Sequence, residues 1–123
     1  MRISEAESVV MEVLWRESEP RIAEDIVAEV APGQGWQEAT VKTLLNRLLR
    51  KKAIAAERDG RRYLYRPLLA REDWLNEQSR SFLDRLYGGQ VSALVAHFSR
   101  SKALSQREIE EIRALIEEID DDA

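Results

Sequence analysis

Residues 38–67, which read EATVKTLLNRLLRKKAIAAERDGRRYLYRP, contain the pattern that decides the fold of this chain. Apolar residues recur at helical spacing from Val41 to Leu48, which predicts a helix over about 38–52. The second half contains Asp59-Gly60, a dipeptide typical of two-residue turns, and after it Tyr63 and Tyr65 alternate with charged or aliphatic residues. This pattern predicts a β-hairpin. The stretch therefore combines a helix with a hairpin that follows it directly.

Two further helices precede this stretch. Ser4 and Glu7 have the spacing of a capping box, and the apolar residues after them predict a first helix. Helical spacing also predicts a second helix over about 22–30, and the Pro- and Gly-rich segment 32–35 predicts a turn. Three helices followed by a hairpin indicate a winged helix-turn-helix domain, which we expect to span residues 1–69.

The rest of the chain is predicted to be helical. Apolar spacing indicates helices over about 71–87 and 91–98, separated by a glycine pair. Ser105 and Glu108 form a second capping-box pattern, which predicts the start of a last helix. The expected fold is mainly α with a small β-hairpin, and residues 70–123 are expected to form a helical dimerisation domain.

The dimerisation prediction follows from the apolar stripes of these C-terminal helices. Two or three short helices within about 50 residues cannot all bury broad stripes against one another. A homodimer would cover the surplus apolar surface. The residues expected at its interface are Trp74, Phe82, Leu83, Leu86, Leu94, Phe98, Ile112, Leu115, Ile116 and Ile119.

The charge distribution separates the two parts of the chain. The net charge is −4, but residues 42–66 contain nine basic and two acidic side chains, a local charge of +7. Residues 68–123 contain seven basic and twelve acidic side chains, a local charge of −5. Because salt screens charges farther away than about 10 Å, a basic segment can bind DNA within an acidic protein.

The outward face of the predicted helix 38–52 has no carboxylate after Glu38, and instead presents hydroxyls, an amide and cations. Such groups reach base edges and phosphates in a DNA major groove, and arginines near the hairpin tip suit the backbone or the minor groove. An ordinary basic, solvated helix face is the alternative. The predicted DNA-binding residues are Thr40, Lys42, Thr43, Asn46, Arg47, Arg50, Lys51, Arg58, Arg61 and Arg62.

Four segments in the same order resemble the penicillinase repressor (BlaI/MecI) family, which is related to the copper-responsive CopY repressors. They are residues 5–15, the run ATVKTLLNRL at 39–48 with its basic end, GRRYLYRP at 60–67, and SFLDRLYGG at 81–89 continuing to Val95. The resemblance implies a homodimer that binds a palindromic DNA operator and represses transcription. A winged-helix protein-interaction adaptor that does not bind an operator is the alternative reading.

The chain departs from the family pattern at its regulatory features. Family repressors that sense antibiotics are inactivated by cleavage of an Asn-Phe bond, and the corresponding pair here is His97-Phe98. The candidate cleavage bond is therefore His97-Phe98 and the candidate partner an inactivating protease, although the missing Asn argues against this route. The chain has no cysteine, so the copper site of the related branch is not expected.

Other functions have little support in the sequence. No phosphate-binding loop, nucleophile motif or metal-ligand cluster is present, so we expect no enzyme activity, no cofactor and no metal. No apolar run approaches the length that spans a bilayer, so we expect no membrane association and a cytoplasmic location.

Overall fold

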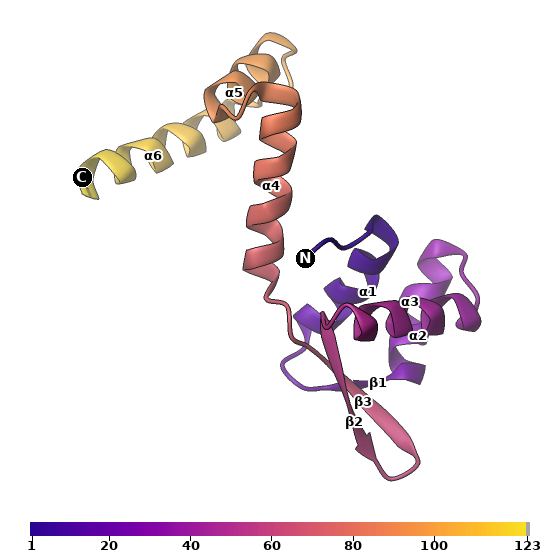
Figure 1. The fold of residues 1–123 in the computed structure, drawn as a ribbon. Coiled ribbons are helices and arrows are strands. Elements are labelled where there is room, and N and C mark those ends of the chain that lie inside the picture. Colours follow the sequence, from indigo (N-terminus) through magenta and orange to yellow (C-terminus); the bar gives the residue numbers. More distant parts are fainter. Residues whose placement is uncertain (123) are drawn as a thin grey trace. The chain divides into compact units, whose positions relative to one another are not determined.

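The computed structural model describes residues 1–122 and forms two compact units, residues 1–76 and residues 77 onward. The first unit contains three helices and a small sheet whose hairpin extends beyond them (Figure 1). This confirms the predicted fold class. Its elements are α1 (Glu5–Arg16), β1 (Arg21–Ile22), α2 (Ala23–Gln34), α3 (Glu38–Arg50), β2 (Ile54–Asp59) and β3 (Arg62–Pro67).

The predicted capping box starts α1. The Glu7 N–H donates to Ser4 Oγ at 3.0 Å, and the Ser4 N–H donates to Glu7 Oε1 at 2.9 Å. Two backbone N–H groups that helix geometry leaves unpaired are thereby satisfied. The position of Glu7 is consequently fixed by its own helix, which matters for the end of α3 described below.

The predicted turn at 32–35 was wrong, because α2 continues through Pro32 and ends at Gln34. Pro32 lies in the last turn, where the loss of its N–H breaks one helical bond without breaking the helix. Gly35 ends the helix with φ 70°, and both its N–H and that of Trp36 donate to the Ala31 carbonyl. A residue at positive φ after the last helical turn is a common helix stop.

A short strand, β1, stands where the sequence predicted the start of a helix. Arg21 pairs with Tyr65 and Ile22 with Leu64, so the sheet order is β1-β3-β2 and all pairs are antiparallel. Because Ile22 has no capping side chain, α2 begins at Ala23 without a side-chain hydrogen bond at its N-cap. Strand β1 anchors the base of the hairpin to α2.

The hairpin turn is shifted by one residue from the predicted Asp59-Gly60. Asp59 pairs with Arg62, so the two loop residues are Gly60 and Arg61. Gly60 has φ 67°, and Arg61 is not among the residues with positive φ. Glycine at the first loop position is the requirement of the type II′ turn, which suits the twist of a hairpin.

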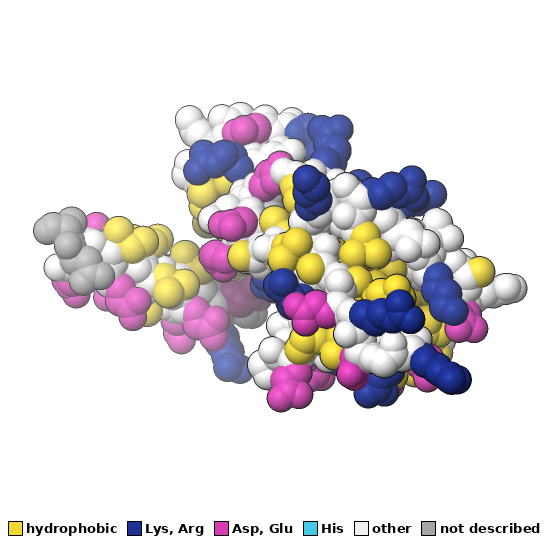
Figure 2. Space-filling view, turned by 60° about the horizontal axis from the view of Figure 1, so that its bottom comes forward, with side chains coloured by type: hydrophobic (Ala, Val, Ile, Leu, Met, Phe, Trp, Pro, Cys, Tyr) yellow, Lys and Arg dark blue, Asp and Glu magenta, His cyan; other side chains and the backbone are white. Residues whose placement is uncertain are grey.

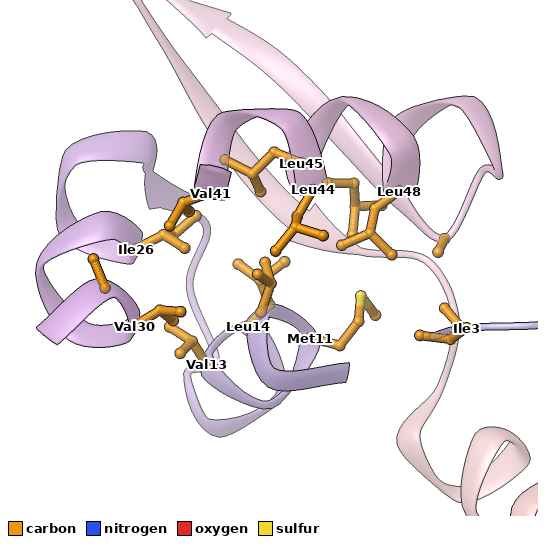
Figure 3. Close-up of a cluster of buried hydrophobic side chains, with 14 residues drawn as sticks. Ile3, Met11, Val13, Leu14, Ile26, Val30, Val41, Leu44, Leu45 and Leu48 are labelled. Atoms are coloured by element: carbon orange, nitrogen blue, oxygen red, sulfur yellow. The ribbon is translucent and has the colours of Figure 1, made fainter. Parts of the chain in front are cut away.

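The hydrophobic core of the first unit lies between its three helices (Figure 3). The inward face predicted for α3 is confirmed, because no side chain from this face is more than 4% exposed. At the centre, Leu14 of α1 and Ile26 of α2 approach this face (Figure 3). Ile54 of β2 is 1% exposed and belongs to the same core. The residues of the α3 face are Val41, Leu44, Leu45 and Leu48.

Helix α4 (Arg71–Tyr87) has the predicted bounds, and α5 (Val91–Arg100) is two residues longer than predicted. The predicted capping box of α6 (Gln106–Asp122) is confirmed, because the Glu108 N–H donates to Ser105 Oγ at 3.1 Å and the Ser105 N–H to Glu108 Oε1 at 3.3 Å. None of the helices among residues 1–122 is long and apolar enough to cross a membrane.

Candidate nucleic-acid interface

The structure exposes all ten residues that the sequence assigned to DNA binding. Seven are on α3 or at its C-terminal end, and three are in or next to the turn of the hairpin. The buried face of α3 leaves the opposite face free for a ligand. Figure 2 shows several Lys and Arg side chains (dark blue) spread over the face of the protein that it presents, with hydrophobic side chains between them.

The seven cations among these ten residues fall into two groups. Three have an acidic partner: Lys42 binds Glu38 (3.1 Å), Arg62 binds Asp59 (3.4 Å) and Lys51 binds Glu7 (2.6 Å). The other four have no ion pair within the described part of the chain, and their charge is available to an anionic ligand. They are Arg47 and Arg50 on α3, and Arg58 and Arg61 on the hairpin.

Lys51 has a structural role that the sequence did not predict. Its ammonium contacts Glu7 Oε1 and also donates to the Arg2 carbonyl at 3.0 Å, which ties the end of α3 to the start of α1. Glu7 is only 2% exposed. Burial raises the pKa of Glu7, but hydrogen bonds from Lys51 and Ser4 outweigh burial and hold the pKa below its ordinary value.

No sequence signal could have identified this pair, because the two residues are 44 positions apart. The position of Lys51 within a basic run instead suggested a phosphate contact. The Lys51 ammonium is already bound to the Arg2 carbonyl and to Glu7. This structural role competes with the DNA contact that the sequence predicted for Lys51.

A cleft of about 280 Å³ lies between the hairpin, the start of α2 and the start of α3. Tyr63 lines this cleft and is 49% exposed, although the sequence analysis left it out of the site. In sequence, the alternation of Tyr63 and Tyr65 with charged or aliphatic neighbours predicts a strand and gives no signal for a site. The residues that line the cleft are Ile22, Ala23, Glu24, Glu38, Lys42, Arg61, Arg62, Tyr63 and Tyr65.

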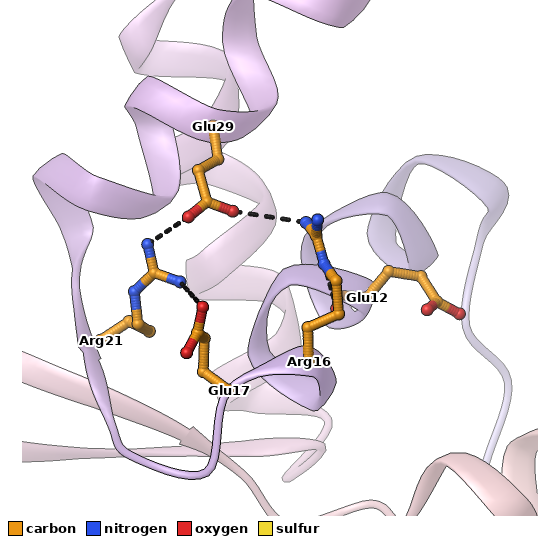
Figure 4. Close-up of polar contacts among 5 residues, drawn as sticks. All are labelled: Glu12, Arg16, Glu17, Arg21 and Glu29. Carbon is orange, nitrogen blue, oxygen red and sulfur yellow. Dashed lines mark hydrogen bonds and ion pairs between the residues drawn. The ribbon is translucent and has the colours of Figure 1, made fainter.

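An ion-pair network holds β1, and through β1 the hairpin, against the helices (Figure 4). The Arg21 guanidinium binds Glu29 of α2 and Glu17, and Arg16 of α1 binds Glu29 at 3.3 Å. The hydrogen bond that Arg21 donates to Glu29 raises the pKa of Arg21, whose side chain is 15% exposed. The network ties β1, and with it the hairpin strand β3, to α1 and α2.

The first turn of α4 is attached to α1. The ring centroids of Trp15 and Trp74 are 5.2 Å apart, the Trp15 indole N–H donates to the Leu69 carbonyl at 2.8 Å, and Arg71 binds Glu12 at 3.1 Å. Trp74, which the sequence assigned to the dimer interface, thus packs within the first unit. The proposed dimer surface therefore rests on the other nine residues.

Those nine residues lie on α4, α5 and α6, and none of them is buried. No side chain from residue 77 to residue 121 is fully buried. Leu86 is 57% exposed, Leu115 58% and Ile119 67%. Apolar side chains left in water at this density are typical of a surface that a partner covers.

The candidate cleavage bond, between His97 and Phe98, lies inside α5. The Tyr87 hydroxyl and His97 Nδ1 are 2.7 Å apart, and the rings of His97 and Phe98 are stacked with centroids 5.6 Å apart. A protease needs an extended segment, so cleavage here would require local unfolding of α5.

Comparisons with known proteins agree with this geometry. The family model described as penicillinase repressor matches residues 3–118. The penicillinase repressor of Bacillus licheniformis is 34% identical over 117 residues, which are 95% of this chain and 91% of that protein.

Two solved structures resemble the first unit. The solution structure of the DNA-binding domain of the repressor BlaI has a TM-score of 0.54 at 32% identity, covering 58% of this chain and 87% of that chain. The Bacillus licheniformis BlaI monomer in complex with the blaP half-operator has a TM-score of 0.52 at 32% identity, covering 59% and 88%.

Proposed function

Because this chain belongs to the penicillinase repressor family, we propose that it is a transcriptional repressor that binds operator DNA through α3 and the hairpin. The observation that carries the proposal is the set of four arginines without acidic partners in the described chain, placed on α3 and the adjacent hairpin. A relative of known structure binds a half-operator, which supports the same use of this domain here. We propose that the first unit, residues 1–76, binds DNA and that the following residues provide the dimer interface, so the boundary lies seven residues after the one expected from the sequence.

Thr43 and Asn46 are the residues proposed to read bases. The Thr43 hydroxyl donates to the Ala39 carbonyl at 2.9 Å, which leaves its lone pairs to accept a hydrogen bond from a base edge. Asn46 is exposed on the same helix, and an amide can both donate to and accept from adenine. Thr40 and Lys42 flank them, and the arginines supply phosphate contacts.

We also propose that the repressor is a homodimer on a palindromic operator. The exposed apolar side chains of α4, α5 and α6 supply the surface that two copies would bury. Two-fold symmetry would present two copies of α3 to half-sites about one DNA turn, or a multiple of it, apart. Oligomers of this kind bury the same patch on both subunits.

Fluorescence anisotropy with the full chain tests the proposal. The probe is the duplex upstream of its own gene, compared with a shuffled duplex at several salt concentrations. We expect nanomolar-range affinity for the first and a weaker affinity, by about a thousandfold or more, for the second. Equal affinity for both duplexes at physiological salt would contradict operator recognition and favour a protein-interaction role.

Asn46→Ala and Arg47→Ala separate base reading from charge. Asn46→Ala should reduce the preference for the operator by about 1–3 kcal/mol while leaving the salt dependence unchanged. Arg47→Ala should weaken binding to both duplexes and reduce the slope of log affinity against log salt by about 0.9. If the two variants behaved alike, the division between base and phosphate contacts would be wrong.

A further inference from the structure

The pairing register divides the hairpin β2–β3 into two faces of different chemistry. Directly paired residues lie on the same face of a sheet, and successive residues alternate between faces. Ile54 is 1% exposed and belongs to the core, so its face points toward the helices. Following the register from Ile54 to the turn, this helix-side face continues through the pair Ala56–Tyr65 and ends with the pair Arg58–Tyr63.

The opposite face carries the acidic residues of the hairpin. Glu57 binds Arg66 at 3.6 Å, and Asp59 binds Arg62 at 3.4 Å. Each arginine on this outer face therefore has a carboxylate beside it. The formal charge of the two pairs together is zero, so this face offers little attraction to a polyanion.

The helix-side face has no acidic residue in its outer half. Arg58 is exposed, forms no ion pair within the described residues, and is held at the turn by a hydrogen bond from its Nε to the Gly60 carbonyl at 3.1 Å. Tyr63 lies directly across from it and is half-exposed. Both Tyr63 and Arg62 line the cleft next to α3, but Arg62 is already bound to Asp59. A guanidinium and a phenol hydroxyl side by side supply several donors and no negative charge.

We propose that the hairpin binds the DNA backbone with this helix-side face and its turn, through Arg58, Tyr63 and Arg61, and that Arg62 and Arg66, each paired with a carboxylate, do not contact DNA. This inference rests on the proposed function, and it adds Tyr63 to the site while removing Arg62 from it. The Arg58 guanidinium pairs with one phosphate, and the Tyr63 hydroxyl donates a hydrogen bond to the backbone of the same strand. The occupant is duplex DNA, because the free groups are donors and cations on the side of α3.

The interior of the cleft is not the phosphate site. Glu24 and Glu38 line it, and Glu38 also neutralises Lys42. Two carboxylates repel a phosphate at short range, so the backbone is expected to lie along Arg58 and Tyr63 rather than between the hairpin and α2.

The test compares arginines on opposite faces of the same hairpin in the full chain. Arg58→Ala and Arg66→Ala remove the same group, one from each face. We measure affinity for the operator and for a shuffled duplex as a function of salt. Arg58→Ala should weaken binding to both duplexes by about tenfold and reduce the salt slope by about 0.9. Arg66→Ala should change affinity less than about twofold and leave the slope as it was.

Two further variants keep the charge of the helix-side face constant. Tyr63→Phe removes only a hydroxyl and should weaken binding about threefold to tenfold without changing the salt slope. Asp59→Asn frees Arg62 and should leave affinity unchanged if the outer face is turned away from DNA. Circular dichroism of each variant ensures that only folded protein is compared.

The outcomes separate this inference from the proposed function. Equal losses for Arg58→Ala and Arg66→Ala, or a gain of affinity for Asp59→Asn, would overturn the face assignment even if the wild type recognised its operator. A wild type that binds both duplexes equally would overturn operator recognition, but the salt slopes of the variants would still decide which face contacts the backbone. A wild type that binds neither duplex would overturn both.

Discussion

Replacing Lys51 by Met tests whether this residue holds α3 in place or contacts DNA. The Lys51 ammonium lies 2.6 Å from Glu7 Oε1, and Glu7 is 2% exposed while the Lys51 side chain is 38% exposed. Breaking a buried ion pair typically costs about 3–5 kcal/mol, because one charge stays buried without its partner. The partial exposure of Lys51 reduces this, and we expect a loss of about 2–3 kcal/mol in the free energy of unfolding.

Urea denaturation followed by circular dichroism measures the loss, with Arg61→Met as the matched control. Arg61 is exposed and has no ion pair in the part of the chain that the structure describes, so its replacement should change stability by less than about 0.5 kcal/mol. The DNA assay should give the reverse order. Arg61→Met should lower the salt slope by about 0.9, and Lys51→Met should leave the slope unchanged.

A double-mutant cycle with Glu7→Gln makes the assignment specific. If Lys51 acts through Glu7, the two substitutions together should cost less than the sum of the single costs. Additive costs, or a Lys51→Met variant with wild-type stability and a reduced salt slope, would refute the structural role and return Lys51 to the DNA contacts.

Three other predictions concern stability and assembly. The pKa of Glu7 is lower in the folded chain than in the unfolded one. Glu7 therefore contributes fully to stability above the ordinary carboxyl pKa, and the contribution is lost as the pH falls through the folded pKa. Urea titrations at a series of pH values should show a smaller loss of stability toward acid pH for Glu7→Gln than for the wild type. Lys52, which follows α3, has φ 63°, a conformation that strains a residue with a Cβ atom but not glycine. Lys52→Gly should therefore raise the free energy of unfolding by about 1 kcal/mol, and a lower urea midpoint for this variant would show that Lys52 is not strained. Leu115→Asp should convert the proposed dimer to monomer in sedimentation equilibrium. Gln106→Glu, which adds the same single negative charge to α6, is the control, and a dimer of unchanged affinity for Leu115→Asp would exclude Leu115 from the interface.

The sequence predicted the elements of this fold wherever the signal is local. The inward face of α3, the two capping boxes and the bounds of α4 follow from spacing within one or two helical turns, and all are confirmed. Each of these features depends on residues fewer than about ten positions apart. Local periodicity is sufficient for them because the interacting groups are neighbours in the chain.

The features that the sequence missed depend on distant partners or on competition between local signals. Strand β1 has two residues and exists only because β3 pairs with it, more than forty positions away. Pro32 usually stops a helix, but here the Gly35 stop is three residues later and lets α2 finish its turn. The hairpin turn moved by one residue because the pairing of Asp59 with Arg62 places Gly60 first in the loop.

The candidate site was predicted as a set of exposed residues but not as a set of free charges. Composition gave the nine cations of residues 42–66 but not their partners. Lys42 and Arg62 have partners three or four positions away, whereas the partner of Lys51 comes from α1 and that of Arg66 from the other strand of the hairpin. Lys51 and Arg62 look the same in sequence as Arg50 and Arg61. The positions of Glu7 and Asp59 in space distinguish these two paired cations from their unpaired neighbours.

The packing of Trp74 on Trp15 determines how short a working fragment of this protein can be. A fragment that stops at residue 69 would contain every strand and helix of the winged-helix domain, yet it would expose one face of Trp15 and remove Arg71 from Glu12. Such a fragment should be prone to aggregation and reduced in yield. A fragment extended to residue 76 keeps both contacts, so we expect it to be the minimal length for producing the DNA-binding portion by itself.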